Sequence, residues 1–504
     1  MLKYGGIIDA PLHQKLYHLI IERLEGKDIQ NPHYQDKIVR LVDKGIGGFI
    51  LFGGKRDEVK DFVKRLQALA EIPLFIASDV ERGVGQQVDG TTYFPCQMAM
   101  AAATDRFNPY DVGILEQAIQ AVACEADDVG INMPLIPVLD VNQNPDNPII
   151  CTRAFSDDPE VVTWFGLKYI ETLEKSGLVS CAKHFPGHGD TAIDSHISLP
   201  VIRKSYEELL GTDIMPFRAA VSHGVSSIMI GHLSLPAIDT MPASLSKEIH
   251  ALLREDLGFE GLILTDALTM SALDHIPDVG VRCLNAGADI LLHPSDPDET
   301  VKTLLSALLS GHLHEDQIDA VLTRIIRRKA MLPALKTKEI DCQGNSLLSS
   351  QLSEKSISPV KISPGILPIL GTDDIHIFLA GDREPADRSP LGGLSANVRM
   401  LDEPRDSLDL HNSVAIIALY TSVAAWKGSA GIAADEREQI REIIRRSQKS
   451  IVISFGNPYV LRHFPDSDIL VAAYESTEQA QKTVVTWLRD SKKLEGRIPV
   501  RLLF

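Results

Sequence analysis

The sequence predicts an α/β fold: a (β/α)8 TIM-like barrel followed by a smaller α/β sandwich domain. Between residues 45 and 330, short apolar runs alternate with segments of helical periodicity. Polar residues follow several of these runs, and a second series of apolar runs begins after residue 373. Repeated β-then-α units are typical of parallel sheets. Functional side chains at the ends of many strands favour a barrel over a doubly wound sheet, which concentrates its ligands at one switch point.

Seven runs are predicted as barrel strands because they are nearly continuous in apolar residues, as strands buried on both faces are. They are residues 47–52, 73–77, 135–141, 178–185, 226–231, 261–266 and 288–293. Helices are predicted near 59–70, 110–129 and 320–335. The first 26 residues have apolar positions at helical spacing and lack the basic-then-apolar pattern of a signal peptide, so we expect helix there.

The ends of the predicted strands carry polar residues: Asp79, Asp140, Lys183, His184, His232, Asp266 and His293. Parallel strands of a barrel bring their carboxyl ends to one rim, where barrel enzymes hold their active sites. The segment GVGQQV (83–88) lacks the third glycine of a dinucleotide-binding loop, so no such cofactor is expected.

The second half of the chain has its own β-and-α series. Pro333 and the polar residues 336–345 indicate a linker, and a helix is expected near 346–356. Strands are predicted at 374–381, 413–420, 450–458 and 468–474, with a helix at 436–449. The predicted domains are therefore a catalytic barrel at 1–335, a linker and connecting helix at 336–360, and a C-terminal sandwich at 361–504.

Composition excludes several classes of partner. The net charge is -18 and the pI is about 5.3, which disfavours nucleic acid and anionic membranes. No stretch approaches the 18 uninterrupted apolar residues of a membrane span. The six cysteines show no zinc-binding spacing and are expected to be free thiols in a reducing compartment. We expect a cytoplasmic protein.

The run KHFPGHGDTAIDSH (183–196) is the densest cluster of reactive side chains. As a metal site it would use His184, His188 and His196 with Asp190 or Asp194. Pro186 and Gly187, however, interrupt the helix that would align the first two imidazoles, so no metal is expected. As a proton relay, Asp194 and His196 share one side of an extended loop, where the carboxylate could orient the imidazole for acid–base catalysis. Taken alone, an Asp-x-His pair favours the simpler interpretation of His196 as a surface loop residue.

Three further residues carry two interpretations each. Asp266 ends an apolar strand and could attack an anomeric carbon as a nucleophile, or cap the following helix. Asp79 also ends a strand and could bind sugar hydroxyls, or pair with Arg82. Arg153 could serve as a hydrogen-bonding fork in a polar pocket, or form a structural ion pair.

Together, these segments resemble the β-N-acetylglucosaminidase branch of glycoside hydrolase family 3. The resemblance rests on KHFPGHGDTAIDSHISLP (183–200), LTDAL (264–268), DNPIICTRAFSDDPEVV (146–162) and, in the second domain, SFGNPYVLRHFPDSDILVAAY (454–474) and GRIPV (496–500). It implies a retaining two-step mechanism with Asp266 as nucleophile and with His196, oriented by Asp194, as acid/base on a mobile loop. It further implies that an N-acetylglucosamine (GlcNAc) ring is held by Asp79, Arg153, Lys183 and His184.

The chain departs from the branch's pattern at two points. Gln87 stands where an arginine would contact ligand, and the second domain is missing from the branch's single-domain members. The expected activity is exo-acting removal of β-linked GlcNAc from peptidoglycan fragments, by a monomer or homodimer without cofactor. Alternatives are a phosphorylase, a β-glucosidase and, from another class, a catalytically inactive sugar-binding protein.

Overall fold

The computed structural model describes residues 5–332, 340–371, 373–382, 389–403, 409–424, 426–490 and 493–502. Pro333 and residues 336–339 of the predicted linker lie outside the described residues. The chain forms two compact units. The first comprises Met1–Phe94, Glu116–Val141 and Pro159–Ser346, and the second Pro95–Leu115, Asn142–Asp158 and Leu347–Phe504. The predicted domain boundaries at 335 and 360 stay predictions.

Eight parallel strands close into a ring within the first unit. They are β1 (Ile20–Glu25), β2 (Gly48–Phe52), β3 (Phe75–Ser78), β4 (Met133–Pro134), β5 (Cys181–Phe185), β6 (Ser227–Ile230), β9 (Leu262–Thr265) and β10 (Leu291–Leu292). One sheet has the order β10-β1-β2-β3-β4 and another the order β5-β6-β9. Parallel bridges at Val138–Lys183 and Leu264–Ile290 join the two sheets at both edges. The predicted α/β barrel is confirmed.

The N-terminal helix prediction is wrong for residues 20–25. Helix α1 (Leu12–Tyr17) ends early, and the apolar run that follows is strand β1. This strand pairs with β2 on one side and β10 on the other, so its core-forming residues are buried from both directions. A short apolar run fits both periodicities, and the tertiary pairing decides between them.

The strand predicted at 135–141 is wrong in position, because the strand lies just before it and only Val138 of this range forms a β-bridge. Strand β4 ends at Pro134, and a cis peptide precedes Pro137. Prolines lack the N–H group that a central strand donates. The segment keeps partial pairing with β5, since Leu139 N donates to the Lys183 carbonyl at 2.7 Å.

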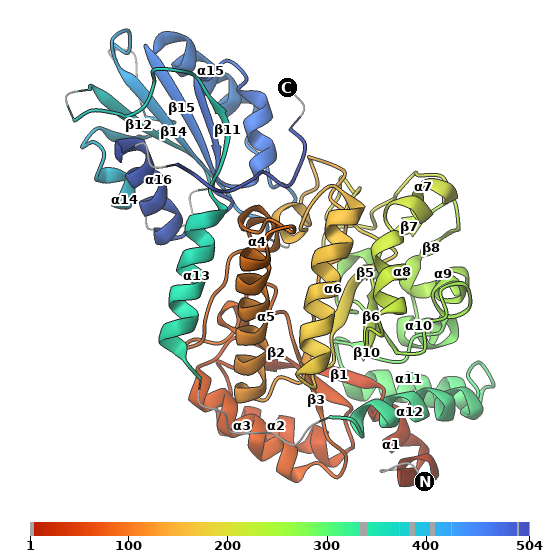
Figure 1. Cartoon of the computed structure of the whole chain (residues 1–504). Coiled ribbons are helices and arrows are strands. Elements are labelled where there is room, and N and C mark those ends of the chain that lie inside the picture. Colours follow the sequence, from red (N-terminus) through yellow and green to blue (C-terminus); the bar gives the residue numbers. More distant parts are fainter. Residues whose placement is uncertain are drawn as a thin grey trace. The chain divides into compact units, whose positions relative to one another are not determined.

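Helices alternate with the barrel strands and lie around them (Figure 1). Helix α3 buries Val59, Phe62, Val63 and Leu66 on one face, as its spacing predicts. The Asp296 side chain caps α11 by accepting bonds from two backbone N–H groups. The longer helices of this region are α2 (Pro32–Asp43), α3 (Arg56–Leu69), α5 (Pro109–Val129), α6 (Pro159–Lys175), α8 (Met215–Ser222), α10 (Val279–Ala286), α11 (Pro297–Leu309) and α12 (Glu315–Lys329).

Short elements fill the connections in residues 5–332. They are η1 (Gly5–Asp9), η2 (Val84–Gln86), α4 (Gln97–Ala103), η3 (Cys151–Arg153), α7 (Tyr206–Gly211), β7 (Ser234–Leu235), β8 (Asp239–Pro242), η4 (Ala243–Leu245), α9 (Lys247–Ala251), η5 (Leu252–Asp256) and η6 (Ser271–Leu273). No helix in the described part of the chain combines the length and apolar character needed to cross a membrane.

The second unit contains a mixed sheet of order β11-β16-β15-β14-β12-β13, parallel except for β11. Its strands are β11 (Ser358–Ile362), β12 (Ile375–Gly381), β13 (Val398–Met400), β14 (Val414–Thr421), β15 (Lys449–Gly456) and β16 (Ile469–Ala472). Its other elements are α13 (Cys342–Ser356, which begins in the first unit), α14 (Ser389–Gly392), α15 (Ala434–Arg446), η7 (Pro458–His463) and α16 (Glu478–Asp490). The predicted strands and helix of this half are confirmed.

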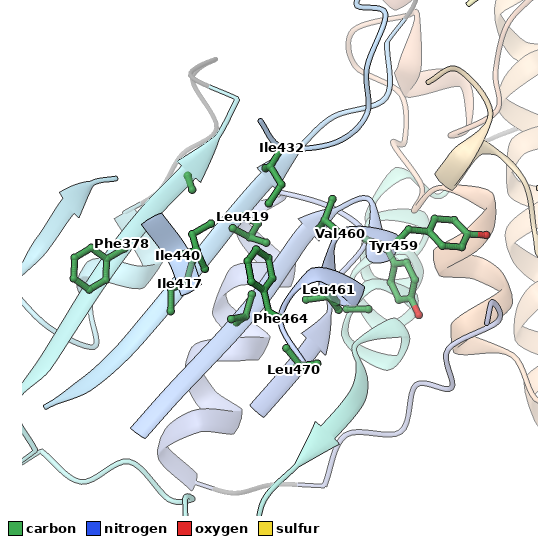
Figure 2. Packing of buried hydrophobic residues seen from close by; sticks show 14 of the residues in the cluster. Phe378, Ile417, Leu419, Ile432, Ile440, Tyr459, Val460, Leu461, Phe464 and Leu470 are labelled. Carbon is green, nitrogen blue, oxygen red and sulfur yellow. The ribbon is translucent and has the colours of Figure 1, made fainter. Parts of the chain in front are cut away.

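Alternate residues of these strands build a core on each face of the sheet. Ile417 and Leu419 of β14 pack with α15 and η7 on one face, the cluster shown in Figure 2. The intervening Ile416 and Ala418 pack with α14 and α16 on the other. Continuous apolar strands are required where both faces are covered, which is why these strands stood out in the sequence.

Candidate active site

The carboxyl ends of the barrel strands present the predicted reactive side chains. Asp79 directly follows β3, Lys183 and His184 lie in β5, and Asp266 directly follows β9. Since these strands are parallel neighbours in one closed ring, their ends meet at the same rim.

Lys183 joins two carboxylates at this rim. Its Nζ lies 2.5 Å from Asp79 Oδ1 and 2.8 Å from Glu81 Oε1. Lys183 and Glu81 are buried, whereas 31% of the Asp79 side chain remains exposed. Asp79 is thus held by Lys183 rather than by Arg82, and it still has accessible surface for a ligand. Sequence reasoning missed Glu81, whose position two residues after Asp79 was the available signal.

His184 is fixed by Asp140. Its Nδ1 lies 2.7 Å from Asp140 Oδ2, and the other carboxylate oxygen accepts the backbone N–H of His188 at 2.6 Å. Burial acts to raise the pKa of Asp140, but the His184 imidazole and these hydrogen bonds outweigh it and hold that pKa below its ordinary value. An ionised Asp140 makes Nδ1 the donor and leaves Nε2 of His184 for other partners.

Asp266 lies where imidazoles surround it. Its Oδ1 accepts the N–H of Ala267 at 2.8 Å. Burial acts to raise the pKa of Asp266, but His184, His232, the Ala267 N–H and His196 together hold it below its ordinary value. The carboxylate is therefore ionised at neutral pH. The residues directly after it form a turn rather than a helix, so Asp266 does not cap one.

His232 supports the peptide that follows Asp266. Its Nε2 donates to the Ala267 carbonyl at 3.1 Å, and its Nδ1 accepts from the Ser244 hydroxyl at 2.8 Å. Burial lowers the pKa of His232, which favours the neutral ring that these two bonds require. The sequence placed His232 at the rim without indicating this role.

The loop after β5 brings Asp194 and His196 together as predicted from their spacing. Asp194 Oδ1 accepts both His196 Nδ1, at 2.8 Å, and the His196 backbone N–H, at 2.9 Å. The Asp194 side chain is fully buried, while 23% of His196 is exposed. Because Nδ1–H donates to Asp194, Nε2 is the nitrogen of His196 that can exchange a proton with a ligand.

The middle of the same loop is braced by His188. Its Nδ1 lies 2.8 Å from the Thr191 hydroxyl and its Nε2 lies 3.0 Å from the Ser195 hydroxyl. Gly187 has φ +129° and approaches Asp213 so closely that a Cβ would lie 2.7 Å from the Asp213 Cβ. The three histidines of the run therefore have different hydrogen-bond partners: Asp140 for His184, Thr191 and Ser195 for His188, and Asp194 for His196.

Two other predicted positions have different surroundings. Gln87 Nε2 donates to the Asp79 carbonyl at 3.1 Å, so this side chain supports the backbone of a predicted sugar-binding residue. Arg153 ends η3 in the second unit, where its Nη1 donates to the Ile149 carbonyl at 2.9 Å. The part Arg153 plays beside the barrel residues stays a prediction.

Comparison with known proteins identifies the family. Residues 12–328 match the glycosyl hydrolase family 3 N-terminal domain. The chain belongs to glycoside hydrolase family 3. The match spans all eight barrel strands.

Relatives of this family 3 chain include both hydrolases and phosphorylases. A β-N-acetylglucosaminidase/β-glucosidase of Cellulomonas fimi is 28% identical over 525 residues, covering 93% of this chain and 90% of that protein. The structure of a family 3 β-N-acetylglucosaminidase from Paenibacillus sp. str. FPU-7 is 26% identical, with a TM-score of 0.82 and coverage of 98% and 99%. The β-glucoside phosphorylase BglX bound to 2FGlc is 25% identical, with a TM-score of 0.87 and coverage of 98% and 95%.

Proposed function

We propose that this family 3 enzyme is a retaining, exo-acting β-N-acetylglucosaminidase. The observation that carries the proposal is the Asp194–His196 pair, 2.8 Å apart, on the loop beside the ionised Asp266. The named activities of the Cellulomonas and Paenibacillus relatives support GlcNAc as the sugar.

In the first step, an Asp266 carboxylate oxygen attacks the anomeric carbon of the terminal GlcNAc. The bond to the leaving oxygen breaks as His196 Nε2 gives that oxygen its proton, and a glycosyl-aspartate forms. Asp194 stabilises the imidazolium from which this proton comes. In the second step, the now neutral His196 takes a proton from water, and the resulting hydroxide displaces Asp266 from the anomeric carbon.

Four side chains are proposed to position the sugar: Asp79, Arg153, Lys183 and His184. Lys183 and Asp140 hold two of them, Asp79 and His184, in fixed orientations through bonds of 2.5 and 2.7 Å. Such preorganisation lets binding energy favour the transition state instead of ordering the site. Peptidoglycan fragments are the proposed substrates, acted on in the cytoplasm by a monomer or homodimer that binds no nucleic acid.

Hydrolysis of p-nitrophenyl β-GlcNAc tests the proposal. Asp266→Asn should reduce kcat/KM by more than about a thousandfold, because the nucleophile is lost. Asp274→Asn, a change on the following segment, is the matched control and should retain activity. Undiminished activity in Asp266→Asn would exclude Asp266 as nucleophile.

A phosphorylase is the second candidate. An imidazole acid/base carries no negative charge that would repel an incoming phosphate, as a carboxylate would, and BglX is named a phosphorylase. Product analysis of chitobiose turnover with and without phosphate separates the two. Release of free GlcNAc at a rate independent of phosphate supports hydrolysis. Formation of GlcNAc-1-phosphate would instead show that the enzyme is a phosphorylase. Preference for a β-glucoside over the β-GlcNAc substrate would indicate a β-glucosidase.

A further inference from the structure

The second unit has a polar pocket at the carboxyl edge of its parallel strands. The pocket, of about 210 Å3, lies between the loop that follows β14 and the η7 segment that follows β15. Its lining includes Gly428, Gly431, Arg437, Asn457, Arg462 and His463. Open α/β sheets bind their ligands outside the carboxyl ends of the strands. The volume is below the roughly 300–1,000 Å3 of drug-sized ligand pockets, so it suits a compact ligand.

Basic side chains from two elements meet in this pocket. Arg437 comes from α15, while Arg462 and His463 come from η7. Arg437 Nη1 lies 3.4 Å from His463 Nε2, and Arg462 Nη2 lies 2.6 Å from Asp146 Oδ1. Arg462 Nη1 is buried without a hydrogen-bond acceptor among the described residues. A buried guanidinium N–H without an acceptor is energetically unfavourable, and an anionic ligand would supply one.

The lowered pKa of His463 is consistent with an excess of positive charge in the pocket. Burial lowers the pKa of His463 to about 4, and the charges of Arg462 and Arg437 add to this effect. Asp146 also lines the pocket, but 75% of its side chain is exposed, so solvent screens its charge. This local excess of positive charge occurs in a chain of net charge -18.

The pocket wall is fixed by its own hydrogen bonds and by the core. Asn457 Nδ2 donates to the Ala430 carbonyl at 2.9 Å, and Asn457 Oδ1 accepts the Tyr459 N–H at 2.8 Å. Ile432, Tyr459 and Val460 line the pocket and also belong to the buried cluster in Figure 2. The loop and η7 are thereby held together around the cavity.

We propose that this pocket binds a phosphoryl group, either as inorganic phosphate or as part of a small phosphate ester. Two guanidinium groups can each donate paired N–H bonds to a tetrahedral oxyanion, and the His463 ring and the glycine-containing loop bound the remaining space. The site is independent of the sugar chemistry proposed for the barrel.

Isothermal titration calorimetry of the full chain with inorganic phosphate, at constant ionic strength, tests this site. Saturable binding should be weakened about ten- to hundredfold in Arg437→Gln and in Arg462→Gln. Arg445→Gln, on the same helix with 63% of its side chain exposed, should leave binding unchanged. Tighter binding of glucose 6-phosphate than of phosphate would identify an ester as the ligand, and the reverse would identify free phosphate.

Thermal melting monitored by circular dichroism checks that each variant is folded. If Arg462→Gln does not fold, the phosphate affinity of Arg437→Gln alone tests the proposal. Absence of saturable phosphate binding by the wild-type chain would overturn the proposal. So would phosphate binding of equal strength in a folded Arg437→Gln variant, since the ion would then bind elsewhere. Neither result depends on whether the chain hydrolyses GlcNAc.

Discussion

Asp194→Asn isolates the contribution of the carboxylate to the proposed proton relay. The substitution keeps the size of the side chain but removes the charge that faces His196 Nδ1 at 2.8 Å. It replaces a charge-assisted hydrogen bond with a neutral one, and the amide can also select the tautomer that places the proton on the wrong nitrogen. Loss of about 1–3 kcal/mol of transition-state stabilisation corresponds to a roughly 5- to 150-fold lower kcat/KM.

The assay compares two substrates with different leaving groups. A nitrophenolate departs with little protonation, whereas the sugar alkoxide released from chitobiose needs a proton from His196. The loss in Asp194→Asn should therefore be larger for chitobiose than for p-nitrophenyl β-GlcNAc. Asp190→Asn is the control because it removes the same charge from the same loop, 3.7 Å from Lys204. Equal losses for both substrates, or an effect no larger than that of the control, would refute the relay.

Three further predictions concern the surrounding structure. Lys183→Met removes the buried ion pair with Glu81 and should lower the free energy of unfolding in urea by roughly 3–5 kcal/mol. Lys175→Met, at an exposed surface pair, should lower it by less than about 0.5 kcal/mol, and similar losses in both variants would contradict the contribution of the buried pair. His188→Ala should reduce kcat severalfold without unfolding the chain, because the braced loop loses two hydrogen bonds; unchanged kinetics would show that the brace is dispensable. Burial lowers the pKa of Lys329 to about 7, against about 10.4 when unfolded, so the unfolded state binds more protons between these values and wild-type stability rises with pH across them. Lys329→Met removes the buried amine. The difference in free energy of unfolding between this variant and the wild type, measured by chemical denaturation, should therefore shrink from pH 7 toward pH 10. A difference that stays constant with pH would contradict the lowered pKa of Lys329.

Local pattern was sufficient to predict the strands that are buried on both faces. The run 261–266 is nearly continuous in apolar residues, and the polar residue at its end, Asp266, marks the rim. Strand β1 was missed because the residues around it also satisfy helical spacing. Only pairing with β2 and with the distant β10 makes it a strand, and no local signal reports that pairing.

The candidate site was predicted only in part for a similar reason. Asp194 and His196 lie two residues apart, so their contact follows from local geometry. The contacts of Lys183 with Glu81 and of His184 with Asp140 span about 100 and 44 positions and depend on closure of the barrel. The sequence therefore indicated which side chains reach the rim, but not which carboxylates hold them.

Trapping the proposed glycosyl-enzyme tests the central claim most directly. A ring-fluorinated β-GlcNAc fluoride should glycosylate the nucleophile and form an adduct that hydrolyses slowly. Mass spectrometry of the digested chain can then detect this adduct. We expect a mass increase of one fluorinated GlcNAc on the peptide that contains Asp266, and we expect this increase to be absent in Asp266→Asn. An adduct on another residue, or turnover of the reagent with release of the α-anomer as first product, would contradict a retaining mechanism at Asp266.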